Sequence, residues 1–274
     1  IASILTGQFP RQGLLPTSRD YPRNLFTLLG GEYDMRLFEC STSFRPELRF
    51  SAERLRIPAW RRLYSFAADS AIAWLHLTLP AEFAGWLPRI TQGWSFTDLS
   101  IIDAPDYFRA FVESLEPSAR PRLAFLHCVL PHVPYRFLPS GQRYRYSFHY
   151  RIPGLDQETE QWGSDEWLVD QAWQLYYLQA MFADRLLGEL IDSLKKSGQY
   201  DETLLIATAD HGVSFRPNRN RRWIADADPA DILYVPLFVK GPGQRQVGPD
   251  DRNAEHIDIL PTIADWLEIE VPWA

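Results

Sequence analysis

Hydrophobic and polar positions divide this chain into short apolar runs and longer segments with helical spacing. The short runs predict strands at residues 34–40, 122–130, 204–208 and 232–243. Apolar residues spaced three or four positions apart predict helices at residues 21–31, 165–196 and 256–269. Strands that alternate with helices in this order are typical of an α/β fold with a mostly parallel sheet.

The clearest helical pattern covers residues 165–196. Its apolar side chains recur at steps of three or four residues, or multiples of these: Leu168, Ala172, Leu175, Phe182, Leu186, Leu190 and Leu194. Ser164 is a suitable N-cap, and Lys195 and Lys196 in the last turn favour an end just before Gly198. We therefore expect one long helix with a single buried face.

Two regions lack such regularity. Residues 41–120 are rich in Arg, Pro and Trp, and we expect a largely helical insertion over the sheet rather than a second domain. Residues 137–163 show no sustained period and predict a loop. The length and the 46% hydrophobic content suit a single domain over residues 1–274.

Composition narrows the classes of partner. A net charge of −7 argues against a nucleic-acid binder, which is normally basic. Only Lys195, Lys196 and Lys240 are lysines, so nearly all positive charge is arginine, which reflects either codon bias or recognition of oxyanions by guanidinium groups. The two cysteines, Cys40 and Cys128, are too few for a disulfide framework.

The predicted strand 204–208 is followed at once by Asp210, His211 and Gly212. Ligands of parallel α/β sheets bind beyond the carboxyl ends of the strands, where this triplet falls. A carboxylate and an imidazole form half of a coordination shell for a divalent metal ion, and glycine lets the backbone turn sharply. The alternative is that Asp210 caps the following turn and His211 packs beside it, because short motifs often occur by chance.

Several segments, in order along the chain, resemble the sulfatase / alkaline phosphatase superfamily. The stretch 177–212 resembles the family's helix followed by a strand that ends in DHG, with Tyr177, Asp184, Gly188 and Leu194 at the matching positions. Further matching segments are "IASILTGQFP" (1–10), "FLHCVLPHVPY" (125–135), "VPLFVKGPG" (235–243) and "HIDILPTIADWLEI" (256–269). The resemblance implies an alkaline-phosphatase-like α/β/α sandwich, truncated at its N-terminus, that cleaves an anionic sulfate or phosphate ester.

The resemblance also implies roles for individual residues. Asp210 and His211 match ligands of a divalent metal ion, which the sequence does not identify among Mn²⁺, Ca²⁺, Mg²⁺ and Zn²⁺. His132 matches the histidine that, in lipoteichoic acid synthase-like members, contacts the substrate or its leaving group, and it could donate a proton there. A solvated loop histidine between two prolines is the alternative. His127 is a second catalytic candidate, although its place inside a strand fits a buried structural role equally well.

The arginines at positions 216, 219, 221 and 222 directly follow the DHG triplet. Arg216 and Arg219 are the substrate-binding candidates, and a solvated basic loop is the alternative. His256, just before the last predicted helix, is expected to pack at the start of that helix rather than to bind a metal ion.

Two departures from the family pattern affect the functional expectation. The family's nucleophile and its second acidic metal ligand would precede Ile1, so we expect residues 1–274 alone to be inactive. Val129 stands where arylsulfatases often carry an additional histidine, which favours a phosphoglycerol-type transferase or a membrane-sulfatase branch. A degenerate, non-catalytic binding domain is the remaining alternative. By family analogy, the parent protein is membrane-anchored or exported, attached through segments outside this chain.

Overall fold

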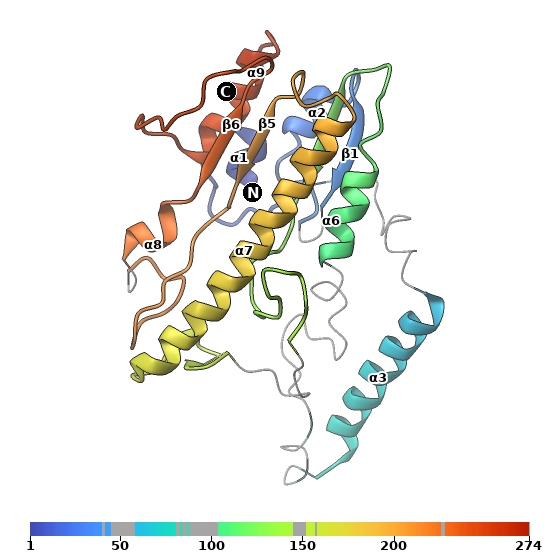
Figure 1. Cartoon of the computed structure of the whole chain (residues 1–274). Helices are drawn as coiled ribbons and strands as arrows, with labels where there is room; N and C mark the ends of the chain where they lie inside the picture. Colours follow the sequence, from blue (N-terminus) through green and yellow to red (C-terminus); the bar gives the residue numbers. More distant parts are fainter. Residues whose placement is uncertain are drawn as a thin grey trace.

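A computed structural model describes residues 1–39, 42–44, 58–80, 83, 87, 104–144, 152–156, 158–225 and 228–273. In this part of the chain, helices lie on both sides of short strands (Figure 1). Strand β1 (Asp34–Phe38) pairs in parallel with β2 (Arg122–Leu126), with Asp34 opposite Arg122 and Phe38 opposite Leu126. The structure therefore confirms the α/β class with a parallel sheet, although this sheet is small.

The second strand pair departs from the parallel pattern. Strand β5 (Leu205–Thr208) pairs antiparallel with β6 (Leu237–Lys240). The predicted strand 232–243 was too long, because residues Pro229–Leu233 form the short helix α8. Proline at the first helical position and the Asp228 side chain, which accepts a hydrogen bond from the Ala230 N–H, start that helix.

The long helix α7 (Glu166–Lys196) confirms the predicted element, and Asp165 rather than Ser164 caps it. The Asp165 carboxylate accepts hydrogen bonds from the N–H groups of Trp167 and Leu168, which otherwise have no partner in the first turn. Its buried face comprises Val169, Ala172, Gln179, Phe182, Leu186, Leu190 and Leu194. Leu168 is partly exposed, and Val169 takes its expected place in the core.

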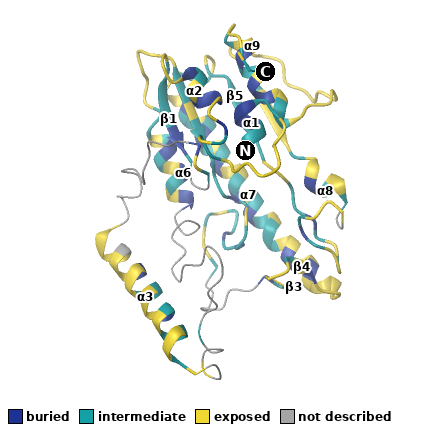
Figure 2. Ribbon diagram, turned by 180° about the vertical axis from the view of Figure 1, so that it is seen from behind, coloured by how far each residue is buried: buried dark blue, intermediate teal, exposed yellow. Residues whose placement is uncertain are grey.

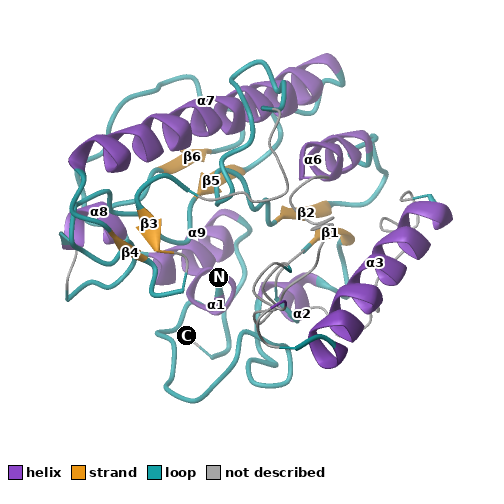
Figure 3. Cartoon of the chain, turned by 90° about the horizontal axis from the view of Figure 1, so that it is seen from below, coloured by secondary structure: helices purple, strands orange, loops and turns teal. Residues whose placement is uncertain are grey.

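Figure 3 shows the strands as a middle layer between two sets of helices. On one side, α7 and α6 (Ala104–Glu113) bury a cluster that includes Phe38, Phe108, Phe111, Phe182 and Leu186. On the other side, α1 (Ala2–Thr6), α2 (Leu25–Leu29) and α9 (Ile259–Trp266) bury Leu5, Phe26, Leu37 and Leu260. Each such Leu or Phe side chain contributes about 1.5–3 kcal/mol when removed from water.

The predicted insertion, residues 41–120, is described only in part. Helix α3 (Ala59–Thr78) stands apart from the sheet, and most of its side chains are exposed (Figure 2). Helix α6, by contrast, belongs to the core, so the interval 41–120 includes an element of the central fold. Residues 40–41, 45–57, 81–82, 84–86 and 88–103, which include Cys40, lie outside the described residues.

The region predicted as a loop, 137–163, contains a small hairpin. Strand β3 (Leu155–Asp156) pairs antiparallel with β4 (Gln161–Trp162). Residues 145–151 and 157 of this region are not among those described. The hairpin lies beside the N-terminal half of α7, close to the loops that follow β5.

Within the described part of the chain, no helix combines the length and the apolar character needed to cross a bilayer.

Candidate active site

The DHG triplet lies just beyond the end of β5. The Nδ1 atom of His211 is 2.8 Å from the carbonyl oxygen of Gly212. A carbonyl only accepts hydrogen bonds, so Nδ1 carries the proton and Nε2 of the neutral ring keeps its lone pair. Nε2 lies 3.9 Å from Oδ1 of Asp210, and the two side chains are 39% and 41% exposed. Two ligand atoms about 2.1 Å from a tetrahedral ion lie about 3.4 Å apart, so a small shift would let this pair share a divalent metal ion. Among the described residues, no group of three or more His, Cys, Asp or Glu side chains completes such a site.

The backbone around the triplet is fixed by two contacts. The Gly212 N–H donates to the carbonyl of Ile232 at 2.8 Å, and a Cβ atom at Gly212 would lie 2.1 Å from the carbonyl oxygen of Asp231. Only glycine therefore fits against α8 here. On the other side, Nε2 of His256 donates to the carbonyl of Ala209 at 2.8 Å. His256, in the 3-10 helix η2 (His256–Asp258), thus supports the residue before Asp210.

His132 lies in the loop that follows β2. Its Nδ1 donates to the carbonyl of Val133 at 2.7 Å, and its Nε2 accepts a hydrogen bond from Nη2 of Arg222 at 2.5 Å. Burial lowers the pKa of His132, and the positive charges of Arg222 and Arg221 lower it further, whereas the bond to Val133 acts in the opposite direction. In this arrangement His132 is neutral and its Nε2 is an acceptor, so it cannot donate a proton until Arg222 moves away.

Arg222 is the arginine that faces the predicted site. Burial and the charge of Arg221 lower the pKa of Arg222, whereas the carboxylates of Glu160 and Asp210 raise it. Its Nε atom is buried without a hydrogen-bond partner among the described residues. The planar guanidinium fork matches an oxyanion, which could replace His132 as the partner of Nη2.

Arg221 anchors the segment that carries Arg222. Its Nη2 lies 2.6 Å from Oε1 of Glu160, and the Arg221 side chain is only 6% exposed. Burial alone would raise the pKa of Glu160, but the hydrogen bond and charge of Arg221 outweigh it, so this pKa is lowered. Glu160 precedes β4, and sequence analysis gave no sign of its role.

The two predicted substrate-binding arginines occupy other places. Arg216 binds Oδ2 of Asp228 at 2.9 Å through Nη2 and Oδ2 of Asp231 at 3.1 Å through Nε. The Arg219 side chain is exposed, and its carbonyl accepts a hydrogen bond from the N–H of Trp162. Among the described residues, no hydrogen bond or ion pair joins either arginine to Asp210, His211 or His132.

His127 forms a pair with a buried acid. Its Nδ1 lies 2.7 Å from Oε1 of Glu39, whose side chain is 4% exposed. Glu39 directly follows β1 and His127 directly follows β2, and the His127 N–H donates to the carbonyl of Phe38. The pair thus lies at the carboxyl edge of the parallel sheet. Glu39 falls inside the predicted strand 34–40, which extends past the observed end of β1 at Phe38, so its place at the edge of the sheet was not predicted.

The chain's first residue lies at the same edge. The backbone nitrogen of Ile1 lies within electrostatic reach of the carboxylates of Asp210 and Glu39.

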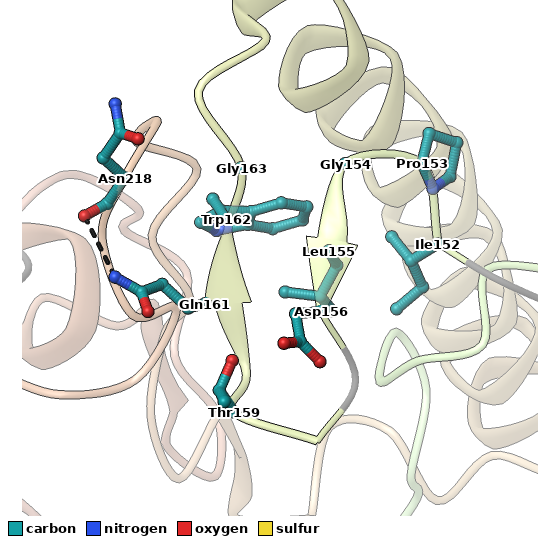
Figure 4. A pocket seen from close by; sticks show the side chains of 10 residues that line it. All are labelled: Ile152, Pro153, Gly154, Leu155, Asp156, Thr159, Gln161, Trp162, Gly163 and Asn218. Carbon is teal, nitrogen blue, oxygen red and sulfur yellow. Dashed lines mark hydrogen bonds between the residues drawn. The ribbon is translucent and has the colours of Figure 1, made fainter.

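A solvent-open cavity of about 600 Å³ adjoins this region (Figure 4). Its lining carries no basic side chain: Ile152, Pro153, Gly154, Leu155, Asp156, Thr159, Gln161, Trp162, Gly163 and Asn218. Asn220 connects the lining to Arg222, since it donates to the carbonyl of Thr159 at 2.9 Å and accepts from the Arg222 N–H at 2.8 Å. Asp156 is the charged side chain of the lining, so the cavity does not favour an anionic group.

A comparison with protein families decides the classification. The family model described as Sulfatase matches residues 96–269, more than half of the chain. The chain belongs to the sulfatase family. It thereby falls within the sulfatase / alkaline phosphatase superfamily, whose members generally use divalent metal ions.

Sulfatase-family relatives match over limited stretches. The multifunctional alkaline phosphatase superfamily protein PehA of Trinickia caryophylli is 37% identical over 93 residues, which are 33% of this chain and 18% of PehA. Lipoteichoic acid synthase 2 of Bacillus subtilis is 28% identical over 102 residues, 35% of this chain and 16% of that protein. The ulvan-active sulfatase of Formosa agariphila is 23% identical over 189 residues, 68% of this chain and 35% of that enzyme.

The solved structure of the phosphonate monoester hydrolase SpPMH from Silicibacter pomeroyi superimposes with a TM-score of 0.56 and 21% identity. The match covers 99% of this chain and 63% of that structure, and it establishes the alkaline-phosphatase-like fold. The chain spans less than two thirds of each of these proteins.

Proposed function

We propose that this chain supplies the metal-binding and anion-binding half of an enzyme that hydrolyses a sulfate or phosphate ester. One observation carries the proposal: Arg222 donates to Nε2 of His132 and also lies close enough to Asp210 for that carboxylate to raise its pKa. Three kinds of group thus lie together beyond the ends of β2 and β5. They are the Arg222 cation for the ester oxygens, the His132 imidazole for the leaving group, and the metal ligands Asp210 and His211. These are the groups that ester cleavage at sulfur or phosphorus requires.

Asp210 and His211 would hold the metal ion, which neutralises charge on the ester and activates the nucleophile when it is bound. The carbonyl of Gly212 orients His211 so that Nε2 faces Asp210. Such hydrogen bonds to the far nitrogen of a ligating histidine fix its tautomer and ring position. His256 supports the same turn through the carbonyl of Ala209.

Arg222 and His132 would act in sequence on the substrate. A non-bridging oxygen of the ester binds the guanidinium group, which then gives up its hydrogen bond to Nε2 of His132. Because the anion also neutralises the charge of Arg222, the pKa of His132 rises and the ring takes up a proton. His132 can then donate that proton to the departing alcohol oxygen.

The nucleophile is proposed to come from residues that precede Ile1 in the parent protein. The position of the Ile1 nitrogen supports this, since Asp210 and Glu39 both act on it. A residue shortly before Ile1 would therefore lie near Glu39 and the DHG turn. A transferase of the phosphoglycerol type is the second candidate, because the similarity to lipoteichoic acid synthase 2 includes part of this chain.

The test uses the full-length parent protein. Wild type and Asp210→Asn are assayed for Mn²⁺-dependent turnover of an aryl sulfate and an aryl phosphodiester, with Asp201→Asn as the matched control. Asp201 lies on the surface in a loose ion pair with Arg245, away from the site. We expect Asp210→Asn alone to abolish turnover. If wild-type protein binds Mn²⁺ and turns over neither ester, the non-catalytic alternative replaces this proposal.

A further inference from the structure

Gln179 is a fully buried polar side chain on the otherwise apolar face of α7. Its neighbours along this face are Ala172, Phe182 and Leu186, which belong to the core. A buried carboxamide is unfavourable unless its donors and acceptor are all used. The partners of Gln179 therefore indicate what this residue does.

All hydrogen bonds of the Gln179 carboxamide go to the loop that carries His132. The two N–H groups of Nε2 donate to the carbonyls of Pro131 and His132 at 3.1 and 2.8 Å, and one of them is shared with the more distant carbonyl of Pro134 at 3.4 Å. Oε1 accepts from the N–H groups of Arg136 and Phe137 at 2.7 and 3.2 Å. One side chain thus binds the loop on both sides of His132.

The loop needs such a partner because of its own sequence. Pro131 and Pro134 have no N–H group, and residues 127–136 belong to no helix or strand. Buried carbonyl and N–H groups that lack a backbone ladder must find partners elsewhere. The carboxamide of Gln179 supplies both a donor and an acceptor, as a neighbouring strand would.

The same part of α7 also orders the chain beyond the DHG turn. Tyr176, one turn before Gln179, packs edge-on against Tyr135 with ring centroids 5.7 Å apart, and against Phe215 at 5.3 Å. Tyr135 follows His132, and Phe215 follows Gly212. A single turn of α7 therefore contacts both segments of the site.

We propose that Gln179 is a positioning residue that holds His132 opposite Arg222. It touches neither substrate nor metal and acts through the backbone of residues 131–137. The effect of Gln179 on kcat rests on the proposed function of His132, whereas its effect on the position of the His132 ring does not. Two experiments measure these two effects separately.

The first readout is the imidazole of His132 in this chain, observed by long-range ¹H–¹⁵N NMR and assigned with His132→Gln. Gln179→Met keeps a similar side-chain volume and removes the carboxamide. We expect it to shift the His132 nitrogen signals and weaken the contact with Arg222, which holds Nε2 unprotonated. Unchanged His132 signals in a folded Gln179→Met protein would overturn the proposal.

Gln199→Met is the matched control. Gln199 also donates to a backbone carbonyl, that of Leu115 at 2.9 Å, and to Ser197, but it lies past the C-terminal end of α7. We expect this control to leave the His132 signals in place. If Gln179→Met does not fold, Gln179→Glu replaces it, because it keeps the side-chain shape and the acceptor but loses the donated hydrogen bonds. The His132 nitrogen signals of this variant then provide the test.

The second readout is a double-mutant cycle in the full-length protein with an alkyl ester, whose poor leaving group needs an acid. A misplaced catalytic group costs about 100-fold in kcat, which is the loss we expect for Gln179→Met. In the His132→Gln background, the same substitution should cause no further loss. Multiplicative losses would mean that Gln179 does not act through His132. If His132→Gln itself leaves kcat unchanged, the proposed function of His132 fails, and the NMR readout still decides the role of Gln179.

Discussion

Replacing Gly212 by alanine tests the packing beneath the DHG turn. The added Cβ would lie 2.1 Å from the carbonyl oxygen of Asp231, 3.1 Å from its carbonyl carbon and 3.4 Å from the Cα of Ile232. All three are backbone atoms, so no side chain can rotate away, and the turn must move by about 1 Å to reach an ordinary contact.

The expected cost combines two terms. Overpacking of this kind costs about 1–3 kcal/mol. Moving the turn also weakens the bond from the Gly212 N–H to the Ile232 carbonyl at 2.8 Å, which contributes about 1 kcal/mol. We therefore expect Gly212→Ala to lower the free energy of unfolding by about 2–4 kcal/mol and to weaken Mn²⁺ binding by Asp210 and His211.

Urea unfolding followed by circular dichroism measures the first effect, and isothermal titration calorimetry with Mn²⁺ measures the second. Gly188→Ala in α7 is the control, because a Cβ there meets no atom within 4 Å. Alanine in a helix should stabilise this control by up to about 1 kcal/mol. A Gly212→Ala protein with wild-type midpoint and wild-type Mn²⁺ affinity would show that the turn accommodates a Cβ atom without moving.

Three further predictions concern the surroundings of the site. His256→Ala should weaken Mn²⁺ affinity about 10- to 100-fold, as loss of a group that supports a metal ligand does, and calorimetry showing equal affinity would contradict it. The folded state lowers the pKa of His132, so acid should favour the unfolded state: stability is intact above pH 6.5 and falls as pH decreases below it. His132→Gln should therefore lose less stability than wild type between pH 7 and 5 in urea titrations, and parallel pH curves would contradict this. Glu160 has a lowered pKa, so the stability that it contributes is present above pH 4.5 and is lost as pH falls below it. Glu160→Gln should therefore flatten the curve of stability against pH in this range, by a small amount because the carboxylate is partly exposed. An unchanged curve would contradict the role of the ion pair.

The elements that depend on local pattern were predictable from the sequence. Helix α7 has a long periodic pattern of apolar residues with polar residues at both ends. Strands β1, β2 and β5 are short, mainly apolar segments that are followed by polar residues. Asp210 and His211 could be placed at the carboxyl edge of a strand for the same reason. The glycine after them could be predicted to allow a turn, but its contact with α8 could not.

The identity of the site arginine depends on contacts between distant residues. Arg216 and Arg222 look alike in sequence, yet Arg216 meets Asp228 and Asp231 whereas Arg222 meets His132, 90 residues earlier. Which arginine faces the site depends on the ion pair between Arg221 and Glu160, which anchors the segment that carries Arg222. It does not depend on the residue types within that segment. Gln179 was hidden for a related reason, because a polar residue on an apolar helix face shows its purpose only through its partners.

In the proposed site Arg222, and not Arg216, receives the anionic ester. Equilibrium binding of inorganic sulfate and phosphate to this chain, with Arg222→Met compared against Arg216→Met, tests it most directly. Arg222→Met loses the charge-assisted hydrogen bonds to the anion, so its anion binding should be at least about tenfold weaker. Folded Arg216→Met should bind the anion nearly as wild type does, because Arg216 is paired with Asp228 and Asp231. Weaker binding in Arg216→Met together with unchanged binding in Arg222→Met would contradict the account.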